Sequence, residues 1–192
     1  MNRPARQFLI RSVIACAALT MLTGPALAAD NPLVRLETSA GNIDIELYPD
    51  RAPASVENFL TLVDGGFYDG LIFHRVVAGF VIQAGGYDER LTYRPPPATV
   101  VNESLNGLSN QKYSVAMARL SDPDSADTQF FINVKHNPNL DAQRGKPGYT
   151  VFGQVVAGMD VVTTIELVNT HVEAGMAGVP EEDVIISRAT RL

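Results

Sequence analysis

The sequence predicts a mainly β protein in which short strands form a closed or nearly closed antiparallel barrel, accompanied by two isolated helices. Short segments that alternate apolar and polar residues recur along the chain, and turns rich in glycine, proline and asparagine separate them. Only two stretches carry the apolar spacing of a helix. The chain has 192 residues, enough for one domain with its own core. It contains no repeat or linker that would divide that domain.

The predicted strands are short segments that are rich in β-branched and aromatic residues. They cover residues 33–38, 43–48, 71–77, 80–83, 113–118, 128–134, 150–156 and 184–192. The first two form a hairpin, in which Gly41 and Asn42 can supply the unusual backbone angles of a tight turn. Gly79 separates the third strand from the fourth.

The first helix is predicted to begin at Pro53 and to stop at Gly65-Gly66, because proline suits the first turn of a helix and glycine its end. Its apolar face consists of Val56, Phe59, Leu60 and Val63. A second helix is predicted over residues 159–168. The long polar segment 86–112 is expected to be a loop system, and such loops are usually functional or mobile.

Residues 1–28 have the pattern of a secretory signal peptide, with a basic start, an apolar run and a small-x-small cleavage site at Ala26-Leu27-Ala28. The apolar run from Ser12 to Gly24 has thirteen residues, too few to span a bilayer. We expect cleavage before Ala29, export to the periplasm, and a mature domain over residues 29–192. The box before Cys16 resembles a lipoprotein site, but Arg11 leaves almost no apolar run ahead of it.

The predicted mature chain is acidic and contains no cysteine. Cleavage removes three arginines, leaving 12 basic against 21 acidic residues and a net charge of −9. Such a chain should repel nucleic acid and anionic membranes. The only cysteine, Cys16, lies in the leader, so neither a disulfide nor thiol chemistry is expected afterwards.

The sequence lacks the patterns of a metal site and of a hydrolase. The histidines, His74, His136 and His171, show no ligand spacing. The acidic loop 122–127 lacks the central glycine and the distal glutamate of a calcium loop. No Gly-x-Ser-x-Gly motif occurs. We therefore expect no metal, no cofactor and no nucleophile–base pair.

Residues 73–86 and 128–134 are the most informative segments, because each surrounds polar groups with aromatic and aliphatic residues. Arg75 and Gln83 lie in the first segment, and Gln129 lies in the second. An arginine among apolar neighbours is rarely buried without a partner or a function. Arg75 could also reach the barrel surface or pair with an acid, and residue type alone does not decide between these interpretations.

These segments resemble the cyclophilin family. Residues 73–83, FHRVVAGFVIQ, are similar to the signature FHRxxPGFxxQ. Met117-Ala118-Arg119 followed by TQFFI at 128–132 is similar to the family's MA…SQFFI segment, and 149–153 to its VFG strand. The resemblance covers nearly all of residues 33–192 and, together with the leader, is closest to the periplasmic cyclophilins of Gram-negative bacteria.

The resemblance implies a peptidyl-prolyl cis–trans isomerase built on an eight-stranded antiparallel barrel capped by two helices. It implies Arg75 as the catalytic arginine and Gln83 as the residue that positions it. The residues implied in substrate binding are Phe80, Val81, Ala118, Arg119, Gln129, Phe131, Leu140 and Tyr149. The implied partners are proline-containing segments of unfolded or exported proteins, and a monomer is expected.

The chain departs from the family pattern at four positions. Asn139 stands where many cyclophilins have a tryptophan that borders the groove, so weak cyclosporin binding is expected. Tyr149 replaces a histidine found in many eukaryotic members. Ala78 replaces the proline before Gly79, and Ala84 replaces the first glycine after Gln83.

These residue types suit rotation about an X–Pro bond, whose barrier is roughly 18–20 kcal/mol. Twisting returns the lone pair to the prolyl nitrogen, and a donor that meets this nitrogen stabilises the twisted state preferentially. Two other classes remain as alternatives. A non-catalytic module could hold proline-containing segments as a chaperone does, whereas a lipocalin-like barrel would have no place for Arg75.

Overall fold

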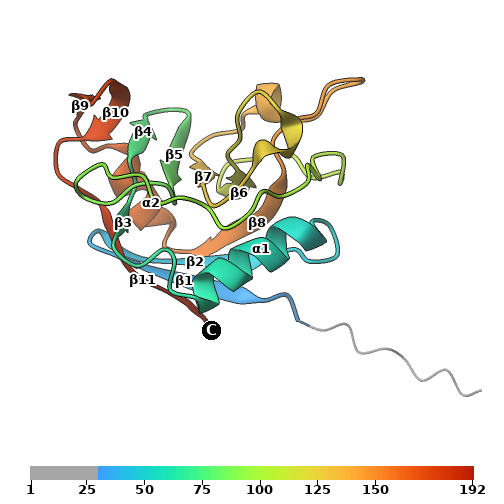
Figure 1. Cartoon of the computed structure of the whole chain (residues 1–192), viewed down its shortest axis with the longest axis horizontal. Helices are drawn as coiled ribbons and strands as arrows, with labels where there is room; N and C mark the ends of the chain where they lie inside the picture. The colour runs from blue at the N-terminus through green and yellow to red at the C-terminus, as the bar shows by residue number, and fades with distance from the viewer. Residues whose placement is uncertain (1–29) are drawn as a thin grey trace, which may run out of the picture.

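The computed structural model describes residues 30–192, so the predicted leader lies outside the described residues. The main feature is a nine-stranded, strongly curled antiparallel sheet (Figure 1). Its strands, in spatial order, are β3 (Leu71–Ile72), β11 (Ile185–Arg191), β1 (Leu33–Thr38), β2 (Gly41–Leu47), β8 (Val151–Ala157), β6 (Ser114–Met117), β7 (Phe130–Asn133), β5 (Val81–Ala84) and β4 (Arg75–Val77). The predicted fold class, mainly β with two helices, is confirmed.

The two edge strands of this sheet, β3 and β4, are consecutive in the chain and correspond to the single strand expected over 71–77. Phe73 and His74 separate them. The chain changes its pairing partner at this point, because β3 pairs with β11 whereas β4 pairs with β5. The sheet therefore curls into a barrel-like shape without a ladder joining its two ends.

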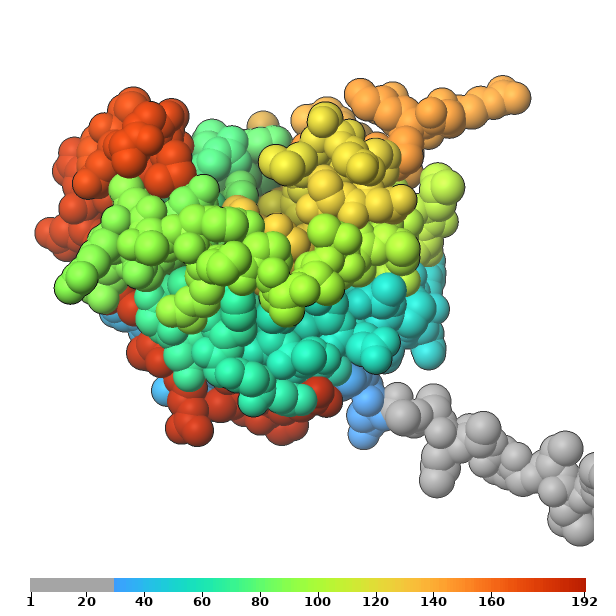
Figure 2. Space-filling view, viewed as in Figure 1, coloured from blue at the N-terminus to red at the C-terminus, as the bar shows by residue number. Residues whose placement is uncertain are grey.

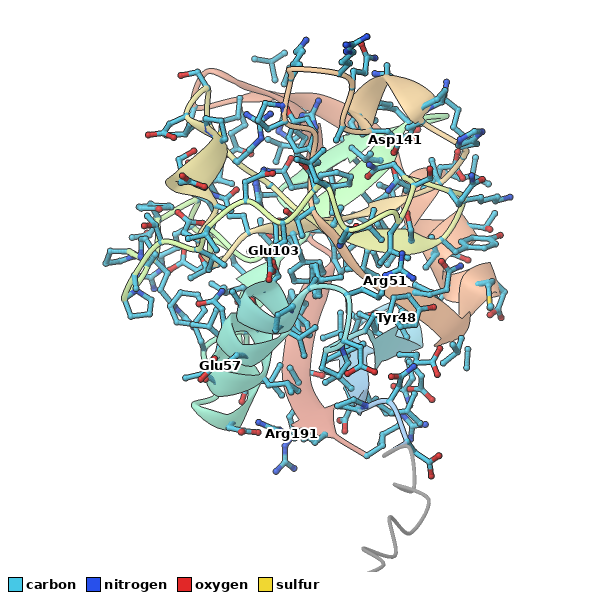
Figure 3. The ribbon with its side chains drawn as sticks, turned by 90° about the vertical axis from the view of Figure 1, so that its right-hand side faces the viewer. Tyr48, Arg51, Glu57, Glu103, Asp141 and Arg191 are labelled. Atoms are coloured by element: carbon cyan, nitrogen blue, oxygen red, sulfur yellow. The ribbon has the colours of Figure 1, made fainter. Side chains whose placement is uncertain are left out.

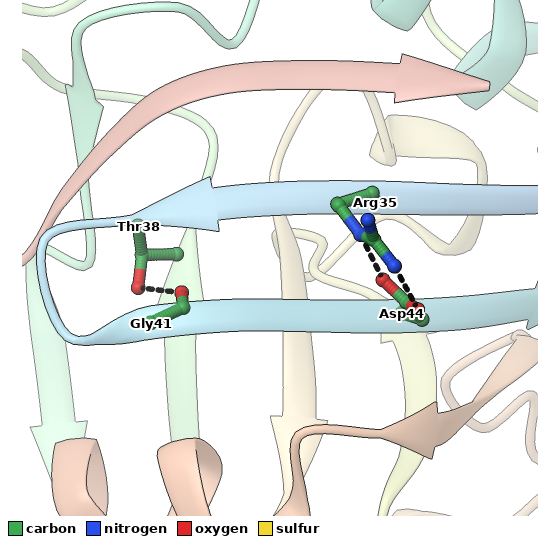
Figure 4. A network of polar contacts seen from close by, with 4 residues as sticks. All are labelled: Arg35, Thr38, Gly41 and Asp44. Atoms are coloured by element: carbon green, nitrogen blue, oxygen red, sulfur yellow. Dashed lines mark hydrogen bonds and ion pairs between the residues drawn. The ribbon is translucent and has the colours of Figure 1, made fainter. Parts of the chain in front are cut away.

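The β1–β2 hairpin is stabilised by polar contacts across the two strands (Figure 4). Arg35 faces Asp44 and donates two hydrogen bonds of 2.7 Å to its carboxylate. These bonds lower the pKa of Asp44. The turn differs from the prediction, because only Gly41 has a positive φ, of 130°, and Asn42 is regular strand. A Cβ atom at Gly41 would lie 2.7 Å from the Val161 side chain, so the second helix also requires glycine here.

The first helix, α1 (Pro53–Asp64), begins at the predicted proline and packs its apolar face against the sheet. Phe59 lies at the centre of an aromatic cluster, with its ring centroid 5.2–5.4 Å from those of Tyr68, Phe130 and Phe152. The N-terminus of α1 lies beside Glu103 (Figure 3). The Glu103 carboxylate accepts hydrogen bonds from Ala54 N and Ser55 N at 3.0 and 2.9 Å, which caps the helix.

The second helix, α2 (Met159–Glu166), ends two residues before the predicted end. Two short 3₁₀ turns lie between strands: η1 (Pro123–Ser125) falls in the acidic loop, and η2 (Pro138–Leu140) lies between β7 and β8. In the space-filling view the loop system 86–112 lies across the molecule above α1 (Figure 2). No helix within residues 30–192 is long and apolar enough to cross a membrane.

One hairpin was not predicted. Strands β9 (Thr170–Glu173) and β10 (Met176–Pro180) form a separate two-stranded sheet. All four residues of β9 are exposed, so the alternation that reveals a half-buried strand is absent from the sequence. Gly178 allows this hairpin to pack against the edge strand β4, because a Cβ atom at this position would lie 2.7 Å from Val76 O.

Candidate active site

A cavity of about 160 Å³ lies where β4, β5, the end of β6, β7 and η2 converge. It brings together nine of the predicted site residues, which come from positions 75 to 149 of the chain. They are Arg75, Phe80, Val81, Gln83, Ala118, Arg119, Phe131, Leu140 and Tyr149. The remaining predicted residue, Gln129, contacts this group through Gln83.

Arg75, Gln83 and Gln129 form a line of hydrogen bonds that begins among the lining residues of this cavity. Arg75 and Gln83 are direct partners across the β4–β5 ladder. Arg75 Nη1 donates to Gln83 Oε1 at 3.3 Å, and Gln83 Nε2 donates to Gln129 Oε1 at 3.0 Å. The ion pairs found within residues 30–192 do not include Arg75. The guanidinium is therefore oriented by an amide and keeps donors available for a ligand.

Six of the nine residues that line the cavity have apolar or aromatic side chains. Val81 and Phe131 are buried together with Ala116 and Val151, in a small cluster separate from the main core. Tyr149 meets Phe131 edge-on, with 5.6 Å between ring centroids. Leu140 closes the far wall, and its carbonyl accepts a hydrogen bond from Tyr149 N. Such a cavity suits a small apolar ring, with the Arg75 guanidinium among the polar groups that line it.

Arg119 shapes the cavity from the opposite side. Its guanidinium carbon lies 4.7 Å from the centroid of the Tyr149 ring, and its nitrogens donate to the carbonyls of Leu120, Pro147 and Gly148. The side chain thus orders residues 147–149. The backbone N–H and C=O of Arg119 form no backbone hydrogen bond within the described chain, so they can pair with an extended peptide.

Two adjoining hollows extend the cavity. One, of about 320 Å³, shares Gln83, Ala118 and Arg119 with it and is also lined by Tyr87 and Tyr93. Sequence reasoning missed these tyrosines because both lie in the segment 86–112, which was expected to be a loop system. The other hollow, of about 420 Å³, includes Asn139. Asn139 therefore borders the groove without lining the central cavity.

His74 precedes Arg75 in the chain and lies between β3 and β4. It is buried, its ring centroid lies 4.8 Å from that of Tyr87, and its Nδ1 atom has no hydrogen-bond partner. Burial, with a smaller contribution from the nearby Arg75 charge, lowers the pKa of His74 to about 4. The imidazole is therefore neutral at ordinary pH.

The remaining sequence departures are accommodated locally. Ala84 is fully buried as the last residue of β5, where it pairs with Phe130. Ala78 is exposed in the turn between β4 and β5.

Within residues 30–192, no group of three or more histidine, cysteine, aspartate or glutamate side chains could hold a metal ion.

Comparison with known proteins connects this geometry to a family. Residues 33–191 match the family model described as cyclophilin type peptidyl-prolyl cis-trans isomerase/CLD. A peptidyl-prolyl cis-trans isomerase of Acinetobacter baylyi is 46% identical over 86% of this chain and 87% of its own. Peptidyl-prolyl cis-trans isomerase A of Dickeya dadantii is 41% identical over 94% and 95%.

Solved structures show the same similarity. A cyclophilin-type peptidyl-prolyl cis-trans isomerase of Cryptosporidium parvum superposes with a TM-score of 0.70 at 25% identity, over 84% of this chain and 98% of its own. The same protein in the presence of the dipeptide Ala-Pro gives a TM-score of 0.68 at 26% identity, over 82% and 96%.

Proposed function

This chain belongs to the cyclophilin-type peptidyl-prolyl cis–trans isomerase family, and we propose that it catalyses X–Pro rotation through Arg75, held by Gln83, at the rim of an apolar proline pocket. The observation that carries the proposal is the 3.3 Å hydrogen bond from Arg75 to Gln83 beside that cavity. A guanidinium oriented in advance toward a bound ring is what this reaction requires.

The proposed reaction involves no covalent bond to the protein and no proton transfer. The planar amide resists rotation because resonance is lost on twisting, which leaves a lone pair on the prolyl nitrogen. Arg75 donates to this nitrogen, or to the adjacent carbonyl oxygen, more strongly in the twisted state than in either planar state. Arginine is a permanently cationic donor, so the guanidinium can stabilise the twisted amide without transferring a proton.

The pocket binds the proline ring, and the groove beside it binds the peptide backbone. Phe80, Val81, Phe131 and Leu140 hold the proline ring and so fix one side of the rotating bond. The unpaired backbone groups of Arg119 offer hydrogen bonds to the extended peptide on the other side. The proposed substrates are proline-containing segments, in line with the Ala-Pro dipeptide present with the related structure.

We further propose that the protein works as a monomer in the periplasm on exported proteins that are still folding. The basis is the leader pattern of residues 1–28, which lies outside the described residues. We also propose weak binding of cyclosporin, because Asn139 offers neither the flat apolar wall nor the indole donor of a tryptophan.

The test is a protease-coupled isomerisation assay on purified residues 29–192 with an X–Pro peptide. Acceleration above the uncatalysed rate is expected. A protein that binds prolyl peptides without accelerating rotation would instead be a non-catalytic binding module, the alternative class considered from the sequence.

A further inference from the structure

Phe80 forms one wall of the proposed proline pocket, yet it lies at the end of an exposed turn. The turn runs from Val77 to Phe80, and Phe80 N donates to Val77 O at 2.9 Å. Gly79, in the third position, has a φ of 67°, whereas Ala78 has no positive φ. This is the pattern of a type II turn, in which the second position favours proline. Alanine leaves this position less constrained.

Two side chains from distant parts of the chain hold the backbone on either side of Phe80. On one side, Glu166 at the end of α2 accepts a hydrogen bond from Gly79 N at 2.9 Å. On the other side, Asn137 Nδ2 donates to Phe80 O at 2.9 Å. Neither residue lines the cavity.

Asn137 is held in one orientation by its surroundings. It is fully buried, and its second amide hydrogen reaches Asn133 Oδ1 at 2.8 Å. Rotating the amide by 180° would place its oxygen against two acceptors, Phe80 O and Asn133 Oδ1.

The contacts continue from Asn133 to the residue that follows Leu140, another lining residue of the pocket. Asn133 Nδ2 donates to Asn110 Oδ1 at 3.1 Å, and Asn110 Nδ2 donates to Asp141 Oδ1 at 2.9 Å. Asp141, marked in Figure 3, follows Leu140 directly. One buried polar chain therefore connects the Phe80 wall with the Leu140 wall.

We propose that Asn137 and Glu166 are positioning residues that clamp the backbone around Phe80 and so set the width of the proline pocket. This inference rests on the proposed function. The pocket wall grips the proline ring similarly in the planar and twisted states, so loosening it should raise KM and leave kcat nearly unchanged. Loss of Arg75 should instead lower kcat, because its donor acts in the twisted state.

The experiment compares Glu166→Ala, Glu166→Gln and Asn137→Asp for kcat, KM and melting temperature. Glu166→Ala should raise KM roughly 3- to 10-fold, the equivalent of one lost hydrogen bond. Glu166→Gln keeps the acceptor and should stay within about 2-fold of the original. Asn137→Asp puts an acceptor against Phe80 O and should raise KM by about 10-fold or more per folded molecule. Glu57→Ala and Asn169→Asp, at exposed positions, are the matched controls.

A rescue experiment separates positioning from general stability. Ala78→Pro constrains the same turn, so Glu166→Ala should lose much less affinity when combined with it. Equal losses with and without Ala78→Pro would overturn the inference, as would an unchanged KM in Glu166→Ala. An unmodified protein without isomerase activity would refute the proposed function instead. If Asn137→Asp does not fold, the KM values of the Glu166 variants, with and without Ala78→Pro, test the inference by themselves.

Discussion

Replacing Arg75 by alanine separates a catalytic role from a structural one. The side chain has one hydrogen bond, of 3.3 Å to Gln83, and no ion pair within residues 30–192. One long, half-buried hydrogen bond contributes about 1 kcal/mol or less to the free energy of unfolding. In a domain of this size that amounts to a change of about 2–4 °C in melting temperature. Arg75→Ala should therefore fold almost normally.

The expected loss of activity is much larger. Removing an oriented transition-state donor typically costs ~3–4 kcal/mol, which corresponds to about 10²–10³ in rate. Arg75→Lys is the matched variant, and it should recover little, because an ammonium cannot reproduce the planar fork that Gln83 orients. Melting temperature and isomerase activity per folded molecule should be measured on one preparation. A destabilised Arg75→Ala protein with near-normal activity would refute the mechanism.

Three further predictions concern the response to cyclosporin, pH and the leader. Asn139→Trp should tighten cyclosporin inhibition while isomerase activity stays normal; potent inhibition of the unmodified protein would contradict this. Folding lowers the pKa of His74 from 6.5 to about 4. The pH-dependent part of the free energy of unfolding that depends on His74, up to ~3 kcal/mol, is therefore fully present above pH 6.5 and is lost as the pH falls toward 4. Urea unfolding should show that His74→Gln weakens this pH dependence and that His136→Gln, at an exposed position, does not. The intact mass of the protein from the periplasmic fraction should match a chain that begins at Ala29. A full-length species in the cytoplasm would exclude the proposed export.

The local pattern of the sequence was sufficient for most elements. Strand alternation and the proline and glycine at the ends of α1 predict elements that the structure contains, because both signals depend on neighbouring residues. The pocket residues could be named because the resemblance rests on ordered motifs. The structure brings nine of them around one cavity, although their roles in catalysis stay predictions.

Other features depend on contacts between distant parts of the chain. No local signal shows that Glu103 caps α1, since it reaches Ala54 across 49 positions. The exposed β9–β10 hairpin has no buried face to give it a periodicity. The change of partner at Phe73 and His74 depends on where β11 and β5 lie.

The same distinction holds at the site. The sequence by itself determined the fold class and the residues that form the pocket, because backbone periodicity and contiguous motifs are local properties of the chain. Only the tertiary structure decided that Glu166 and Asn137, 87 and 57 positions from their partners, hold the two sides of Phe80. A hydrogen bond between such distant groups exists only after the sheet has curled and α2 has docked, so its geometry is a property of the folded molecule.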